Sequence, residues 1–331
     1  MSKYRVLIGD NRETLRTLPD ASVQCVVTSP PYYGLRDYGH DGQIGLESTP
    51  DEYVAALVDV FREVRRVLRD DGVVWLNLGD SYNGNGSTTR IVESEIREST
   101  RSGGLTGGKI PPQGYAPRVK ELKPKDLIGI PWRVAFALQA DGWYLRQDLI
   151  WHKPNPMPES VTDRCTKAHE YLFLLSKSAR YFYDSEAVKE SGVSSDRPFR
   201  PDTKPIKPVG DEKMVKGNSW NQAKGASGYG VSPTGRNRRS VWTIATQPYS
   251  GAHFATFPPK LIEPCILAGS REGDTVLDPF GGSGTTAGVA LKHKRRAILC
   301  ELNPEYAALV DERVNSITDE LRQYYMFDGG G

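Results

Sequence analysis

The sequence DTVLDPFGGSGTTAGVALKHKRRAILCELNPEYAALV, residues 274–310, carries the clearest structural signals in the chain. It begins with a short apolar run that is typical of a buried strand, and three glycines follow within a few residues. Two threonines then open a helical segment, and a second apolar run ends at Glu301. A strand, a glycine loop, a helix and a second strand together predict a βαβ unit with two parallel strands.

The glycine loop of this unit has the features of a ligand-binding site. Glycines let a ligand approach the backbone closely, and the first turn of the following helix offers unpaired N–H groups. Glu301 follows Asp278 by 23 residues and ends the neighbouring strand, where its carboxylate can accept hydrogen bonds from both hydroxyls of a ribose. We therefore expect an adenosine-containing cofactor here, and a plain glycine turn is the structural alternative.

The loop also matches a second cofactor pattern. Residues 282–287 satisfy the G-x-G-x-x-A pattern of dinucleotide-binding proteins, so an NAD(P)-dependent oxidoreductase is an alternative function. That pattern alone is weak evidence for a dinucleotide-binding protein. It does not account for Asp278-Pro279-Phe280 before the loop, nor for a second distinctive segment near the start of the chain.

That second segment is VVTSPPYYGLRDYG, residues 26–39. A β-branched run leads into two prolines, which end the strand because proline has no N–H to donate to a sheet. The prolines also restrict the backbone and leave the carbonyl of Pro30 free to face a ligand. The sequence thus predicts a rigid elbow that presents Ser29 and Tyr32 at the end of a buried strand.

The rest of the chain alternates short apolar runs with amphipathic segments. We expect an α/β fold with a mostly parallel sheet and helices on both faces. Asp70-Asp71-Gly72 is interpreted as a turn that ends a helix. The expected strands are 4–10, 23–28, 73–80, 143–151 and 170–177, and the expected helices are 12–19, 50–68, 131–140, 258–270 and 304–324.

The composition is typical of a soluble globular protein, with 38% hydrophobic and 25% charged residues. No apolar stretch reaches the ~18 residues of a membrane span, and the first residues lack the pattern of a signal peptide. The four cysteines (Cys25, Cys165, Cys265 and Cys300) form no C-x-x-C pair, and the five histidines are dispersed. We therefore expect a cytoplasmic protein without disulfides and without a metal site.

Positive charge gathers in two irregular segments, although the net charge is only +2. Residues 185–240 contain 11 Lys and Arg against 6 Asp and Glu, and residues 86–125 contain 8 against 4. Such segments can follow a polyanion such as DNA, and solvated loops are the alternative interpretation. A nucleic-acid-binding protein without catalytic activity is therefore a third candidate function.

Together, TSPPY at 28–32 and DPFGGSGTT at 278–286 resemble the two signature motifs of S-adenosylmethionine-dependent amino-methyltransferases of DNA. Their order, with the catalytic motif first, resembles the β group of that family. Residues 258–270 resemble the helix that precedes the cofactor loop in this group. Ser before Pro-Pro is most similar to the N4-cytosine enzymes, whereas Asp or Asn there is typical of N6-adenine enzymes.

The resemblance implies a Rossmann-like methyltransferase fold with a circularly permuted, mostly parallel sheet and irregular DNA-binding insertions. The strand at 4–10 is then expected beside the strand that ends at Glu301, with Asp10 close to the cofactor adenine; a simple turn or helix cap is the alternative role of Asp10. The cofactor implied is S-adenosyl-L-methionine. Its expected contacts are Asp10, Phe254, Pro258, Asp278, Phe280, Gly281, Gly282, Ser283, Gly284, Thr285, Glu301 and Asn303.

The expected catalytic residues are Ser29, Pro30, Pro31 and Tyr32. Ser29 Oγ and the Pro30 carbonyl are suited to accept hydrogen bonds from an exocyclic amino group, and Tyr32 offers a ring on which a flipped-out base can stack. The resemblance favours N4 of cytosine, with N6 of adenine as the alternative. Methylation of cytosine C5 needs a thiolate, and the helical pattern around Cys265 instead indicates a buried, inert side chain.

Five segments are expected along the chain. Residues 1–85 and 126–185 form the catalytic half, 86–125 a flexible basic insertion, 186–245 the target-recognition region, and 246–331 the cofactor-binding half. The partner is double-stranded DNA, with a separate restriction endonuclease and oligomer formation as further expectations. The resemblance implies a prokaryotic or phage-encoded enzyme. Expected DNA contacts are Lys213, Lys216, Trp220, Lys224, Arg236, Arg238 and Arg239.

Overall fold

The computed structural model describes residues 3–84, 119–190, 235–247 and 257–328. Within these ranges eight strands form one sheet in the order β1-β8-β7-β2-β3-β5-β4-β6. Five of the seven neighbouring pairs are parallel, and β5 runs antiparallel to both β3 and β4. The strands are β1 (Tyr4–Ile8), β2 (Val23–Thr28), β3 (Leu68–Leu78), β4 (Tyr144–His152), β5 (His169–Ser176), β6 (Val241–Thr243), β7 (Thr275–Asp278) and β8 (Arg296–Glu301).

The sheet has the expected permuted order. The first strand of the chain, β1, pairs in parallel with the last strand, β8, so that Leu7 lies opposite Cys300. Helices α6 (Pro304–Ala308) and α7 (Val310–Asp328) follow β8. The prediction of a circularly permuted, mostly parallel sheet is therefore confirmed.

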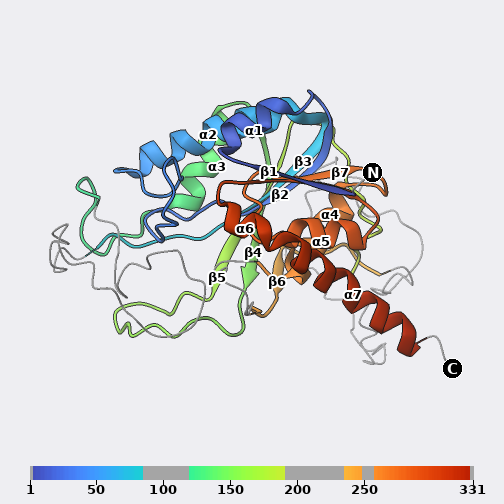
Figure 1. Cartoon of the computed structure of the whole chain (residues 1–331). Coiled ribbons are helices and arrows are strands. Elements are labelled where there is room, and N and C mark those ends of the chain that lie inside the picture. The colour runs from blue at the N-terminus through green and yellow to red at the C-terminus, as the bar shows by residue number, and fades with distance from the viewer. Residues whose placement is uncertain (1–2, 85–118, 191–234, 248–256, 329–331) are drawn as a thin grey trace, which may run out of the picture.

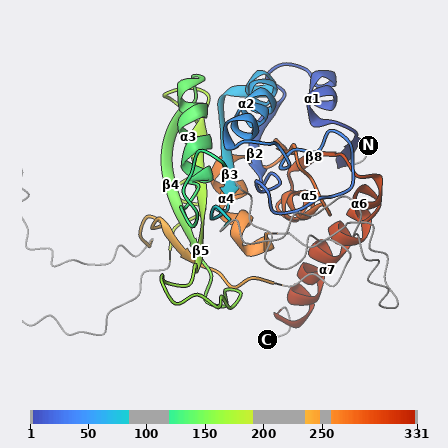
Figure 2. The same ribbon diagram turned by 90° about the vertical axis from the view of Figure 1, so that its left-hand side faces the viewer.

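Helices cover both faces of the sheet (Figure 1). One face carries α1 (Asn11–Thr14), the short 3-10 helix η1 (Leu15–Thr17), α2 (Pro50–Val67) and α3 (Ile130–Ala140). The other face carries α4 (Pro259–Gly269), α5 (Thr285–Lys292) and α7. Figure 2 shows the same molecule from the side, with α3 beside β4 and β5 at one margin and α7 toward the opposite margin.

Each face of the sheet has its own hydrophobic core. Strand β2 contributes to both, because successive side chains of a strand point to opposite faces. Val26 packs into the core beneath α2 and α3, whereas Cys25 and Val27 pack into the core beneath α4, α5 and α7. Burial on both faces explains why β2 has a continuous apolar sequence rather than an alternating one. It also fixes the direction in which β2 delivers the Pro-Pro elbow.

The helix-to-strand junction after α2 differs from the prediction. Asp70-Asp71-Gly72 lies within β3 and is not a turn, since α2 ends at Val67 and the strand begins at Leu68. The pairing of β2 with β3 shifts at this point, from Val23 opposite Leu68 to Cys25 opposite Val73. Gly72 permits this irregularity because a Cβ there would lie only 2.6 Å from Leu68 Cγ.

Four expectations from the sequence can be compared with the described ranges. Cys25, Cys265 and Cys300 are buried free thiols and Cys165 is an exposed one. Cys265 is fully buried in α4, which confirms its interpretation as an inert core residue. In the described part of the chain, no helix is long and apolar enough to cross a membrane, and no three His, Cys, Asp or Glu side chains are grouped as metal ligands.

Candidate active site

A cavity of about 1100 Å³ lies at the carboxyl ends of the neighbouring parallel strands β1, β8, β7, β2 and β3. Residues directly after each of these strands line it, which is where ligands bind in open α/β sheets. These residues are Gly9 after β1, Ser29 after β2, Gly79 after β3, Pro279 after β7 and Leu302 after β8. The fold thus brings the elbow and the glycine loop, 250 residues apart in the sequence, to one site.

The elbow is fixed in place by a residue that the sequence reasoning missed. The Tyr53 hydroxyl, from the buried face of α2, donates a hydrogen bond of 2.8 Å to the Pro31 carbonyl. Burial raises the pKa of Tyr53, so the hydroxyl keeps its proton and remains a donor. The neighbouring Pro30 carbonyl accepts no hydrogen bond within the described ranges, and both Pro30 and Ser29 line the cavity. They are the acceptors that the elbow offers to a ligand.

Asp278 connects the elbow to the glycine loop. Its Oδ1 accepts hydrogen bonds from Thr28 Oγ1 at 2.7 Å and from the Phe280 N–H at 3.0 Å. Its Oδ2 accepts a hydrogen bond of 2.7 Å from Thr286 Oγ1, in the first turn of α5. The carboxylate therefore joins the last residue of β2, the loop and α5.

Burial controls the ionisation of Asp278, which is 2% exposed. Burial raises the pKa of this carboxyl group to about 6, because desolvation disfavours the charged form. The hydrogen bonds from Thr28, Thr286 and Phe280 act in the opposite direction and limit the rise. The buried carboxylate is thus held in its ionised form mainly by these three donors.

The glycine loop closes against the end of β8. Glu301 Oε2 accepts a hydrogen bond from the Gly282 N–H at 2.7 Å, and Oε1 accepts one from the Asn303 N–H at 2.8 Å. Burial raises the pKa of Glu301, and the two backbone donors oppose this effect. Gly281 must be glycine here, because a Cβ would lie 2.8 Å from the Leu299 Cβ.

Asp10 lies at the neighbouring strand end. Its side chain accepts a hydrogen bond from the Arg12 N–H at 2.8 Å and so caps α1. It also forms an ion pair with the Arg12 guanidinium, which lowers the pKa of the Asp10 carboxyl group. Asp10 lines the cavity together with Glu301, as expected of two residues at adjacent strand ends.

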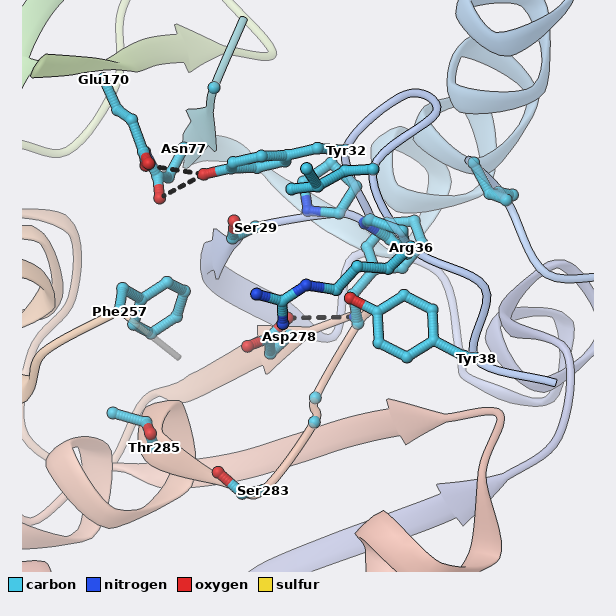
Figure 3. A pocket seen from close by; sticks show the side chains of 18 of the residues that line it. Ser29, Tyr32, Arg36, Tyr38, Asn77, Glu170, Phe257, Asp278, Ser283 and Thr285 are labelled. Carbon is cyan, nitrogen blue, oxygen red and sulfur yellow. Dashed lines mark hydrogen bonds between the residues drawn. The ribbon is translucent and has the colours of Figure 1, made fainter. Parts of the chain in front are cut away.

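The opposite wall of the cavity is built around Tyr32 (Figure 3). Its hydroxyl donates to Glu170 Oε2 at 2.6 Å and lies 3.4 Å from Asn77 Oδ1. The ring packs against the backbone at Gly79, where a Cβ would lie 2.4 Å from Tyr32 Cε2. Burial raises the pKa of Tyr32 well above its usual value, and the Glu170 carboxylate raises it further. Tyr32 is therefore a neutral ring with a fixed orientation.

Arg36 also extends into the cavity between these walls, beside Tyr38 (Figure 3). The two side chains interact by a hydrogen bond, and Tyr38 itself is half-buried. Both follow the elbow directly in the sequence. This loop therefore contributes a guanidinium group and a phenol to the space between Ser29 and Asp278.

Most of the predicted site residues line this cavity. Two do not, namely Pro258, which precedes α4, and Gly284, which precedes α5, although their neighbours Phe257 and Thr285 do. Phe254 lies outside the described residues. Those that line the cavity are Asp10, Ser29, Pro30, Pro31, Tyr32, Asp278, Phe280, Gly281, Gly282, Ser283, Thr285, Glu301 and Asn303.

The expected DNA contacts are only partly described. Lys213, Lys216, Trp220 and Lys224 lie outside the described residues, as do most of 86–125 and 186–245. Arg236 and Arg239 each form an ion pair of 2.9 Å with Glu190. Arg238 lies over the ring of Trp242, with its Cζ 4.5 Å from the ring centroid. Strand β6, at the edge of the sheet, comes from the end of the segment expected to recognise the target.

The sequence did not predict the residues that position the elbow from other strands. Asn77 and Gly79 come from the end of β3, Glu170 from β5, and Lys153 and Trp151 from the end of β4 or just after it. A tyrosine in an apolar helix face and a glutamate in a strand carry no local pattern that marks them as site residues. The only signal is their position at strand ends that meet at the cavity.

The cavity fits an adenosine-containing, methyl-donating cofactor. The Ser283 hydroxyl lines it, is buried, and has no hydrogen-bond partner within the described ranges, so it is a polar group that a ligand can satisfy. Gly281 and Gly282 also line the cavity, so the backbone of the glycine loop faces it. The carboxylates of Asp10 and Glu301 supply acceptors for amino and hydroxyl groups.

Comparisons with known proteins agree with this chemistry. The model of the N6/N4 DNA methylase family matches residues 23–312. The chain is 48% identical to the Type II methyltransferase M.SmaI of Serratia marcescens, over 94% of this chain and 90% of that protein. It is 47% identical to the Type II methyltransferase M.Cfr9I of Citrobacter freundii, over 94% and 87% of the two chains.

Solved structures share the fold at lower identity. The PvuII DNA methyltransferase, described as cytosine-N4-specific, aligns with a TM-score of 0.60 and 20% identity, over 96% of this chain and 92% of that one. A DNA modification methylase from Thermus thermophilus, complexed with S-adenosyl-L-methionine, aligns with a TM-score of 0.57 and 23% identity, over 95% and 94%. The expectation of a Rossmann-like methyltransferase fold is confirmed.

The family match covers both signature segments, the elbow at 28–32 and the glycine loop at 278–286. It confirms the prediction of an S-adenosylmethionine-dependent amino-methyltransferase of DNA. The two other predicted functions, an oxidoreductase and a nucleic-acid-binding protein without catalytic activity, are not supported. The chain belongs to the N6/N4 DNA methylase family.

Proposed function

We propose that this enzyme transfers the methyl group of S-adenosyl-L-methionine to the exocyclic N4 amino group of a flipped-out cytosine in DNA. The observation that carries the proposal is the position of Ser29 and the Pro30 carbonyl, which line one cavity with the glycine loop and Glu301. The bound cofactor supplies an electrophilic methyl group on its sulfonium. The protein has to hold a weakly nucleophilic amino group in line with that methyl.

Ser29 and Pro30 are suited to this task. The lone pair of an exocyclic amino group is delocalised into the base, and hydrogen bonds from its two protons to fixed acceptors concentrate electron density on nitrogen. Ser29 Oγ and the Pro30 carbonyl supply two such acceptors, and the bond from Tyr53 to Pro31 fixes the elbow that carries them. Positioning of this kind accounts for most of the rate enhancement in reactions that need little covalent participation.

At the other end of the cavity, the cofactor is proposed to lie along the glycine loop. Glu301 accepts hydrogen bonds from the ribose hydroxyls, and Asp10 shares its carboxylate between Arg12 and the adenine amino group. Ser283, Phe280 and Asn303 complete the contacts. Asp278 holds the loop in register with the elbow, since its three hydrogen-bond donors come from the end of β2, the loop and α5.

Cytosine is favoured because Ser before Pro-Pro resembles the N4-cytosine enzymes. The neutral Ser29 hydroxyl can accept a hydrogen bond from the amino group and donate one to the ring N3 or O2. The fold shared with the cytosine-N4-specific PvuII enzyme is compatible with this assignment. Adenine N6 is the alternative within the same family. The test is to methylate DNA with labelled S-adenosyl-L-methionine and digest it to nucleosides. Label in N4-methyldeoxycytidine supports the proposal, and label in N6-methyldeoxyadenosine overturns it.

Duplex DNA is proposed to contact the two basic segments, 86–125 and 186–245. The target base has to leave the helix to reach Ser29, as in other enzymes that act on bases. A restriction endonuclease that cleaves the same site is proposed as a separate partner, because the curated relatives are Type II methyltransferases.

A further inference from the structure

The Tyr32 hydroxyl takes part in a polar network at the end of the cavity away from the glycine loop (Figure 3). It donates to Glu170 Oε2 at 2.6 Å, and Asn77 Nδ2 donates to the same oxygen at 3.2 Å. Lys153 forms an ion pair with the other oxygen of Glu170. The Lys153 ammonium also lies 4.3 Å from the ring centroid of Trp151. One carboxylate thus receives three donors from three different parts of the fold.

Stacking alone does not require this network. A base stacks on the face of an aromatic ring, and phenylalanine offers the same face as tyrosine. The hydroxyl of Tyr32 therefore has a different use. Because the ring packs against Gly79 and the hydroxyl is bound to Glu170, neither torsion of the Tyr32 side chain is free to change.

The network also gives a reason for the antiparallel extension of the sheet. Glu170 lies near the start of β5, Trp151 lies at the end of β4 and Lys153 directly after it, so all three reach the cavity from the two strands beyond β3. The Lys153 and Glu170 side chains are 19% and 14% exposed, which shields their ion pair from water. The pair therefore provides a rigid anchor for a group bound to it.

We propose that Glu170, held by Lys153, is a positioning residue for methyl transfer. Through the Tyr32 hydroxyl it sets the plane of the ring on which the target base stacks, and so directs the amino nitrogen at the donor methyl group. This inference rests on the proposed function, because it assumes that a base stacks on Tyr32. A tilt of the ring tilts the base, and small misalignments of reacting atoms cost large factors in rate.

The test is a double-mutant cycle with Tyr32→Phe and Glu170→Ala, with wild-type and variant enzymes assayed for methyl transfer to DNA. Each single variant is expected to lower kcat roughly 10-fold, the cost of losing one hydrogen bond to a charged group. The KM for DNA and the Kd for S-adenosyl-L-methionine should change less than about two-fold, since the stacking face and the cofactor end remain. The double variant should be no slower than the slower single variant.

Multiplicative losses in the double variant, or an unchanged kcat in Tyr32→Phe, would overturn the proposal. Glu170→Gln retains an acceptor for the tyrosine and loses the charge that pairs with Lys153, so it should recover part of the rate lost in Glu170→Ala. A loss in Glu170→Gln equal to that in Glu170→Ala, with melting temperatures unchanged, would assign the effect to the charge and contradict the orienting role of the hydrogen bond.

Two matched controls lie on β4, where Tyr144→Phe and Asp148→Asn change exposed side chains outside the cavity. Both should leave kcat and the melting temperature unchanged. The nucleoside that carries the label is identified in the same reactions. If wild-type enzyme labels adenine, the cytosine proposal fails while the cycle still decides the role of Glu170. If it labels no DNA, both proposals fail.

Discussion

The Thr28 hydroxyl donates a hydrogen bond of 2.7 Å to the Asp278 carboxylate, across 250 residues of sequence. Thr28 is the last residue of β2 and is followed by Ser29, whereas Asp278 is the last residue of β7 and leads into the glycine loop. Both side chains are buried. This single bond therefore joins the two signature segments at the point where the Pro-Pro elbow meets the glycine loop.

Replacing Thr28 by valine should destabilise the protein. The change keeps the shape of the side chain and leaves a buried carboxylate without one of its three donors, which costs about 1–3 kcal/mol. Thr28→Ser retains the hydroxyl and is the matched control, with a smaller loss from the missing methyl group. Denaturant unfolding measures the free energy of unfolding of both variants and of wild type. Equal stabilities for Thr28→Val and wild type would contradict the role of the bond.

The ionisation of Asp278 should appear in the pH dependence of stability. Its pKa is raised in the folded protein to about 6, so the stability that it contributes is fully present below its unfolded pKa and is lost as the pH rises through about 6. A pKa shift of this size lowers the free energy of unfolding by about 3 kcal/mol between pH 4 and pH 7.

The measurement is the free energy of unfolding of wild type minus that of Asp278→Asn, across roughly pH 5 to 7.5, a range that spans the raised pKa. Asparagine occupies nearly the same volume and does not titrate in this range, so other ionisable groups cancel in the difference. The difference should fall as the pH rises. A constant difference, or one that increases, would contradict the assigned direction of the pKa shift.

Gly79 should be essential for activity. Gly79→Ala would place a Cβ 2.4 Å from Tyr32 Cε2 and displace the ring. Because a displacement of about 1 Å can cost 100-fold in rate, we expect a loss of kcat of that order. Gly129→Ala is the control, since its Cβ meets nothing within 4 Å and its backbone has a φ of +79°. That variant should lose roughly 1 kcal/mol of stability and keep its kcat.

Contacts of the basic segment with DNA should be visible in the salt dependence of binding. Arg238 and Arg239 lie at the end of this segment, within the described residues. Each phosphate contact contributes about 0.9 to the magnitude of the slope of log Kobs against log salt concentration. Changing both to glutamine should flatten the slope by roughly one to two units. Arg62→Gln, on α2 and outside the cavity, should leave it unchanged. An unchanged slope in the double variant would refute the contact.

The strands and helices that carry the two signature segments could be predicted from the sequence. Their apolar runs, glycines and prolines act locally, and the parallel order of β1 beside β8 follows once the resemblance to the family is accepted. The junction at Leu68 could not be predicted, because Asp70-Asp71-Gly72 has the composition of a turn. Tertiary contacts keep this segment in the strand, among them the packing of Leu68 in the core and the hydrogen bond from the Phe182 N–H to the Asp71 carbonyl.

The site itself was predictable only where its residues carry a motif. Ser29, Tyr32, Asp278 and Glu301 meet as expected at the ends of parallel strands. The residues that orient them come from elsewhere. Tyr53 reaches the elbow from α2 and Glu170 from β5, 22 and 138 residues away from their partners in the sequence. Such pairings depend on tertiary structure and leave no periodic or compositional signal.

The most direct test of the account is the identity and yield of the methylated nucleoside formed by wild type, Ser29→Ala and the exposed-serine control Ser48→Ala. DNA is incubated with S-adenosyl-L-methionine that carries a trideuterated methyl group, digested, and analysed by mass spectrometry. We predict labelled N4-methyldeoxycytidine from wild type and Ser48→Ala, and about 100-fold slower formation by Ser29→Ala, the cost of one oriented hydrogen-bonding group. Label on adenine N6 or cytosine C5, or an undiminished rate in Ser29→Ala, would contradict it.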